Sequence, residues 1–163
     1  MSDQRHNLDR LAAARSQELV RVIGKSIKGD KQVRATEADN LYTKALGVLQ
    51  EHGLYAMALY LLYRSGNQTG NNTKKYSAEE LIATQAMANL WAMLGEEALT
   101  ELHVMPERSI DWMALNSRDH KEAILTHFSD DLCGSDLGRM LFVKGLFEQT
   151  LIYARYHARA LRE

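Results

Sequence analysis

One histidine of this chain has carboxylates within a helical turn of it. His127 is followed by Asp130 and Asp131 in the segment His-Phe-Ser-Asp-Asp. A general base needs a histidine that a carboxylate orients, and this spacing allows such a pair across a helix end. The same three residues also suit an ordinary polar turn, which is the interpretation that we favour because no nucleophile or metal set accompanies them. We therefore predict no catalytic residue.

Other catalytic signatures of helical proteins are missing from the sequence. No histidine has a glutamate three positions before it, which excludes the Glu-x-x-His pairs of di-iron bundles and the His-Glu-x-x-His zinc proteases. Cys133 is the single cysteine, so there is no Cys-x-x-Cys zinc site. Residues 66–74 contain glycine but lack the Gly-Lys-Ser/Thr of a phosphate-binding loop. We expect no cofactor and no metal.

The basic residues are concentrated at the two ends of the chain. Residues 5–34 contain eight Lys or Arg against three acids, and residues 139–163 contain five against two. The middle, residues 35–138, contains seven against fifteen, although the net charge of the whole protein is only −1. Such an asymmetry indicates a nucleic-acid or phosphate partner on one side and a different partner on the other.

Within these basic ends, the cations fall on one side of each expected helix. Four project within about 60° of one another on the last helix, at about 100° per residue, although Glu148 shares their stripe. Such stripes can follow a phosphate backbone, but a solvated helix face is charged in any case, and arginines in a last turn complement the helix dipole. The candidate nucleic-acid-binding residues are Arg21, Lys25 and Lys28 near the first helix, and Lys144, Arg155, Arg159 and Arg162 on the last.

Apolar spacing and capping residues predict that helices position these side chains. The predicted helices cover residues 4–28, 36–52, 54–64, 77–95, 96–103 and 136–161, with one or two short helices in 107–128. Ser77 begins a Ser-Ala-Glu-Glu capping box, and Gly53 separates two helices with nothing else between them. We find no period-two strand. We therefore predict an all-α fold, a single domain over residues 1–163 built as a compact bundle of about five to seven helices.

Length and composition agree with a cytoplasmic protein. A chain of 163 residues with 45% hydrophobic and 25% charged residues is typical of one globular domain. The first ten residues lack the apolar core of a signal peptide, and no apolar run is long enough to span a membrane. One cysteine agrees with a reducing compartment. We expect no membrane partner.

Two segments resemble a known family. The stretch around Gly53 reads ALGVLQEHGLYAMALYLLYRSG, and the last helix reads GRMLFVKGLFEQTLIYARYHARALRE. Both are similar to the small all-helical subunit of type III-B (Cmr) CRISPR effector complexes. In the first segment the matching residues are Leu46, Leu49, Gly53, Leu54, Ala58, Leu59 and Leu62. This chain departs from the family in having Ala45-Leu46 where many relatives have Leu-Pro. It is also longer, with residues 66–76 and 96–128 as extensions, so a small subunit of another type III or a type I system fits too.

The resemblance implies a non-catalytic part of an RNA-guided interference complex. Copies of such subunits line up beside the backbone that holds the guide RNA, and they stabilise the duplex of guide RNA and target RNA by backbone contacts. The implied partners are both RNAs, the backbone and other subunits of the complex, and neighbouring copies of the same chain. Two alternatives stay open: a cytosolic helical adaptor that binds a protein through an amphipathic groove, and an enzyme with its site at His127.

Overall fold

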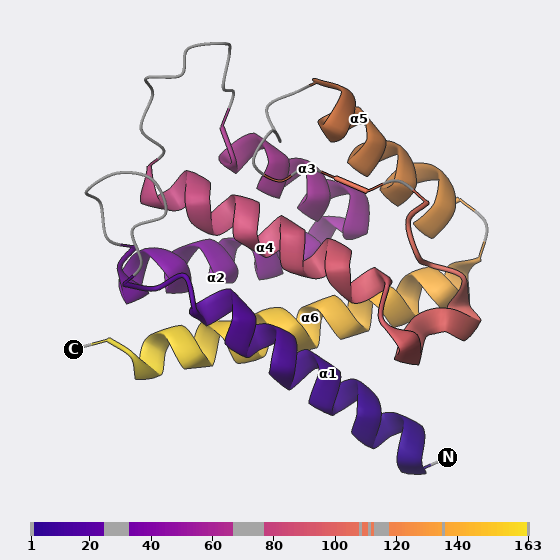
Figure 1. The fold of residues 1–163 in the computed structure, drawn as a ribbon, viewed down its shortest axis with the longest axis horizontal. Helices are drawn as coiled ribbons and strands as arrows, with labels where there is room; N and C mark the ends of the chain where they lie inside the picture. Colours follow the sequence, from indigo (N-terminus) through magenta and orange to yellow (C-terminus); the bar gives the residue numbers. More distant parts are fainter. Residues whose placement is uncertain are drawn as a thin grey trace.

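The computed structural model describes residues 2–24, 33–66, 77–107, 109–110, 112, 118–134 and 136–162, with side chains from residue 7 onward, and all regular secondary structure in these residues is helical. This confirms the predicted all-α fold (Figure 1). In chain order the elements are α1 (Ser2–Val20), α2 (Ala35–His52), α3 (Leu54–Arg64), α4 (Ala78–Leu94), the 3₁₀ helix η1 (Glu97–Leu102), α5 (Arg118–Thr126), the π-helix η3 (His127–Leu132) and α6 (Leu137–Ala160).

A single residue joins α2 to α3, as the sequence predicts. Gly53 has φ +90°, a backbone conformation that side chains disfavour and glycine adopts readily. Its N–H donates to the carbonyl of Leu49 at 3.0 Å, and its carbonyl accepts from the N–H of Met57 at 3.1 Å. The same residue therefore ends one helix and begins the next, because both of its backbone groups are already used by the neighbouring turns.

The longest helix, α6, packs against α1 and α2, while α3 packs against α2 and α4. Leu61 and Leu62 of α3 are buried, so the rest of this chain covers that part of the helix. Its outer side is not covered: Tyr55, Leu59 and Tyr63 are 41%, 47% and 78% exposed. The core includes the fully buried side chains Tyr42, Leu49, Met57, Met87, Leu90, Phe128 and Phe147.

Hydrogen bonds at the helix ends explain where two of these helices begin. The N–H of Glu80 donates to Ser77 Oγ at 3.2 Å, and the N–H of Ser77 donates to Glu80 Oε2 at 3.0 Å. This is the predicted capping box of α4. At the start of α6, Asp136 Oδ1 accepts from the N–H of Gly138 at 2.9 Å. Asp136 therefore fixes the first turn of the helix that carries the C-terminal basic residues.

The first helix is shorter than the sequence predicts. Instead of reaching Lys28, α1 ends at Val20, and a turn follows up to Gly24, which has φ +79°. The N–H of Gly24 donates to the carbonyl of Val33 at 2.9 Å, so the chain folds back here. Because Val22 is buried within this turn, tertiary packing overrides the helical pattern of the sequence.

Two helices form close to their predicted positions, and one segment differs from prediction. The second helix begins at Ala35, one residue before the predicted start, where Glu37 Oε2 accepts from the N–H of Arg34 at 3.4 Å. The short helix predicted over 96–103 forms as the 3₁₀ helix η1. The sequence SDDL, predicted as a turn, continues α5 as a π-helix.

Among the described residues, no helix combines the length and the apolarity that crossing a bilayer requires.

Candidate nucleic-acid interface

The basic stripe of α6 lies along the seam between α6 and α2. Lys144 Nζ, near the start of α6, donates to the carbonyl of Gln50 at the end of α2, at 3.4 Å. At the other end of the seam, Arg162 Nε donates to Thr36 Oγ1 in the first turn of α2, at 3.3 Å. The two helices therefore run antiparallel, side by side (Figure 1). The stripe follows the line where α6 meets α2.

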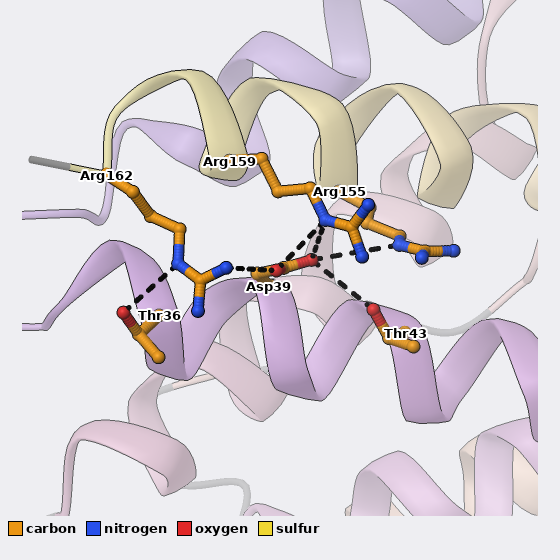
Figure 2. A network of polar contacts seen from close by, with 6 residues as sticks. All are labelled: Thr36, Asp39, Thr43, Arg155, Arg159 and Arg162. Carbon is orange, nitrogen blue, oxygen red and sulfur yellow. Dashed lines mark hydrogen bonds and ion pairs between the residues drawn. The ribbon is translucent and has the colours of Figure 1, made fainter.

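Three arginines of this stripe converge on one carboxylate of α2 (Figure 2). Arg159 Nε donates to both carboxylate oxygens of Asp39, at 3.1 and 3.2 Å. A terminal nitrogen of Arg162 donates to Asp39 Oδ2 at 3.3 Å, and Arg155 Nε lies 3.7 Å from Oδ1. Thr43 Oγ1 also donates to Oδ1, at 3.3 Å. We call Asp39, Arg155, Arg159 and Arg162 the arginine cluster.

Burial within the arginine cluster is uneven. The side chain of Asp39 is only 5% exposed, whereas those of Arg155, Arg159 and Arg162 are 29%, 43% and 44% exposed. The carboxylate therefore lies beneath the guanidinium groups, between the helices. The arginines are neither free surface charges nor core residues, because their inner nitrogens hold Asp39 while their outer ends reach the solvent.

The cluster has a surplus of positive charge and of hydrogen-bond donors. One carboxylate opposes three guanidinium groups, each with five N–H donors. Within the described residues, the hydrogen bonds of these groups use Nε of Arg159, and Nε and one terminal nitrogen of Arg162. Most of the donors are therefore left for a second anion. Guanidinium groups match phosphate well, since two parallel N–H groups can contact two of its oxygens.

Two of the other predicted residues, Lys144 and Arg21, are less well placed for binding an anion. Lys144 lies 3.9 Å from Glu148, the acid of the same stripe, so an ion pair offsets its charge. Arg21 is exposed, but it pairs with Glu18 at 2.8 Å. Lys25 and Lys28 lie outside the described residues. The structure thus groups three of the seven candidates, Arg155, Arg159 and Arg162, around one point.

The chain's two basic ends meet near the start of α2. The hydrogen bond between Gly24 and Val33 brings the turn after α1 beside the beginning of α2. Tyr42 in α2 donates its hydroxyl to the carbonyl of Leu19 at 2.7 Å, and burial raises the pKa of this hydroxyl far above its ordinary value. Arg21 and the exposed Arg34 consequently lie at the same end of the bundle as the arginine cluster.

Sequence reasoning missed Asp39. A signal was present, because Asp39 precedes Tyr42, Leu46 and Leu49 by three, seven and ten positions. That spacing puts it on the apolar stripe of α2, where an acid is costly unless it is paired. A lone carboxylate on a buried stripe predicts a cationic partner, although the sequence alone does not say which one.

The structure brings His127 and Asp131 together in a closed arrangement. His127 is 6% exposed, and its Nδ1 lies 2.7 Å from Asp131 Oδ2. Its Nε2 lies 2.9 Å from the carbonyl oxygen of Val104. Oxygens of the protein therefore lie within hydrogen-bond distance of both ring nitrogens. Asp130 does not join the pair, as its carboxylate accepts from Ser129.

The surroundings of His127 do not suit a phosphate either. A hollow of about 540 Å³ beside it is lined by several carboxylates, including Glu107, Asp119 and Glu122. These charges repel a nucleic-acid backbone. In the described part of the chain, no group of His, Cys, Asp and Glu side chains is placed to hold a metal ion.

No family model, curated protein or solved structure matches the chain. The resemblance to the CRISPR small subunits therefore depends on the two quoted segments. Most of its matching residues around Gly53 are core residues, among them Leu49, Leu54 and Ala58, whereas Leu59 is 47% exposed. In this protein these residues thus mainly serve the packing of two helices joined at one glycine.

Proposed function

We propose that this protein binds the sugar-phosphate backbone of RNA at the arginine cluster and carries out no catalysis itself. The observation that supports this proposal is the surplus of cations over a buried carboxylate. Asp39 holds Arg155, Arg159 and Arg162 in place, while their partly exposed ends retain unused donors. Because the arginines are held before a ligand arrives, binding a phosphate costs little additional ordering of side chains.

The biological setting that we propose follows from the resemblance described above. The protein acts in the cytoplasm as a small subunit of a type III CRISPR interference complex, where it stabilises the duplex of guide RNA and target RNA. In this setting, backbone subunits and neighbouring copies pack against its other faces. Backbone contacts suffice for this role, since base pairing between the two RNAs supplies the sequence specificity.

The alternative function of the arginine cluster is purely structural, as a clamp between α2 and α6. Two variants separate these roles. In Asp39→Asn the clamp is weakened but all three cations remain, so we expect lower stability with undiminished RNA affinity. In the second variant, Asp39→Asn is combined with Arg155→Gln, Arg159→Gln and Arg162→Gln. Here the cations are lost without leaving an unpaired buried carboxylate, and we expect at least about tenfold weaker binding of an RNA duplex at low salt.

The measurement is a filter-binding titration with an RNA duplex at several salt concentrations. Each lost phosphate contact should lower the slope of log affinity against log salt by about 0.9. Arg118→Gln is a matched control, because Arg118 is an exposed arginine of α5 that pairs with Glu122, away from the cluster. If the quadruple variant binds with the affinity and slope of the unmodified protein, the proposal is wrong.

One further observation favours the adaptor as a second candidate function. Two hollows of about 790 and 330 Å³ beside α1 and η1 adjoin each other, since Asn7, Glu97 and Ala98 line both. Their lining combines apolar residues, among them Leu8, Leu11 and Phe142, with charged ones such as Arg10 and Glu101. An amphipathic helix of a protein partner would suit such a mixed lining. Co-purification of a protein partner without RNA, lost in Phe142→Glu, would favour this function over RNA binding.

A further inference from the structure

An exposed aromatic side chain lies next to the arginine cluster. Tyr156 follows Arg155 directly and precedes Arg159 by three positions in α6, and it is 62% exposed. Residues three apart on a helix are surface neighbours, with about 5–6 Å between their Cβ atoms. Tyr156 therefore neighbours Arg159 on the surface of α6, and its exposure places it outside the seam with α2.

The neighbouring tyrosine of α6, Tyr153, has a structural partner. Tyr153 is half-buried, and its hydroxyl donates to the carboxylate of Asp9, so it fastens α6 to α1. Among the described residues, no ring contact, hydrogen bond or ion pair involves Tyr156. An isolated exposed tyrosine needs no explanation by itself. Its position beside a surplus of arginines is what suggests a ligand.

A cation beside an exposed ring fits the two halves of a nucleotide. Guanidinium groups bind the phosphate, and a tyrosine ring offers a flat apolar face on which a base can stack. Inside a duplex each base already stacks on its neighbours, so its faces are not accessible. An unpaired base has a free face, and aromatic stacking is the usual way in which proteins bind single-stranded RNA.

We propose that Tyr156 and the arginine cluster together bind one unpaired nucleotide, with its base on the ring of Tyr156 and its phosphate on Arg159. This inference rests on the proposed RNA-binding function and adds a preference for single-stranded RNA at this point of the surface. The preference does not depend on base sequence, because every base has a face that can stack.

The test compares Tyr156→Ala with two other variants. Tyr156→Phe keeps the ring, and Tyr63→Ala removes a tyrosine of α3 that is 78% exposed and distant from the cluster in sequence. The probes are a short single-stranded RNA carrying one 2-aminopurine and a blunt RNA duplex of the same sequence. We expect Tyr156→Ala to bind the single strand about tenfold more weakly and the duplex unchanged. Tyr156→Phe and Tyr63→Ala should bind both probes like the unmodified protein.

A second readout reports on stacking itself. The fluorescence of 2-aminopurine changes when its base stacks, so binding of the single strand should alter it, and Tyr156→Ala should abolish that change. Unchanged affinity of Tyr156→Ala for the single strand, or an equal loss for strand and duplex, would overturn the inference. In either case the proposed function stands if the quadruple variant of the arginine cluster still loses duplex binding. If that variant binds RNA normally, the proposed function itself fails.

Discussion

Two aspartates of this protein meet cations in opposite ways. Asp39 is buried, and three partly exposed arginines surround it. Asp131 is exposed, with 64% of its side chain accessible, and it contacts one buried histidine, His127. In the first site the carboxylate lies inside and the cations face the solvent. In the second site the ionisable ring lies inside and the carboxylate faces the solvent.

This difference shows that the number of partners around a polar group decides whether the group is available to a ligand. At His127, each ring nitrogen faces one oxygen of the protein, from Asp131 or from the carbonyl of Val104. At Asp39, three guanidinium groups share two carboxylate oxygens, and donors remain in excess. A pair of complementary residue types in a sequence does not reveal this balance, which depends on how many partners the fold assembles.

The largest effect on stability should come from Asp39→Ala. This change leaves three guanidinium groups close together with no carboxylate between them, and removing one partner of a buried ion pair is costly. Because the arginines are partly exposed, we expect a loss of about 2–3 kcal/mol in the free energy of unfolding. Urea unfolding followed by circular dichroism measures it. A loss no larger than that of Asp131→Ala would mean that the number of cations around the carboxylate has little effect.

An intermediate effect is expected for His127→Ala. The change removes two polar contacts and the packing of the ring on Trp91, whose centroid lies 5.2 Å away. We expect a loss of about 2 kcal/mol in unfolding free energy. The affinity for RNA, measured below the unfolding transition, should stay constant because the arginine cluster is intact. A drop in affinity as large as that of the quadruple variant would show that the two sites are not separate.

The smallest effect is expected for Asp131→Asn. The amide oxygen can still accept from the histidine ring, and exposed ion pairs contribute little, so we expect a change below about 1 kcal/mol. The same urea titration measures it, with Asp130→Asn as a matched control one residue earlier. A cost as high as that of His127→Ala would contradict the view that the buried ring, and not the exposed carboxylate, stabilises this site.

The sequence predicted most of the helices because their apolar spacing and end residues agree. Ser77 with Glu80, and Gly53 with φ +90°, are local signals that the fold preserves. The end of α1 was not predictable in this way, since the hydrogen bond from Gly24 to Val33 and the burial of Val22 are tertiary features. Local patterns indicate which segments can form helices, whereas packing decides where each helix ends.

The candidate site was predictable only in part. Helical spacing placed Arg155, Arg159 and Arg162 on one stripe, which the structure confirms. The spacing did not say what the stripe faces, and Asp39 lies more than a hundred positions earlier in the chain. For His127 the sequence suggested a carboxylate partner but not the second acceptor, the carbonyl of Val104, because backbone groups leave no trace in a residue pattern.

Because Gly53 alone joins α2 to α3, the number of residues between the two helices decides which side chains of α3 face the core. Each residue of an α-helix advances the side chains by about 100° around the axis. One extra residue inserted at this joint would have to be absorbed within α3, which would turn the buried Leu61 and Leu62 away from the core. Homologues of this protein, if they share the fold, should therefore vary in length elsewhere and keep a fixed number of residues between Asp39 and Leu62.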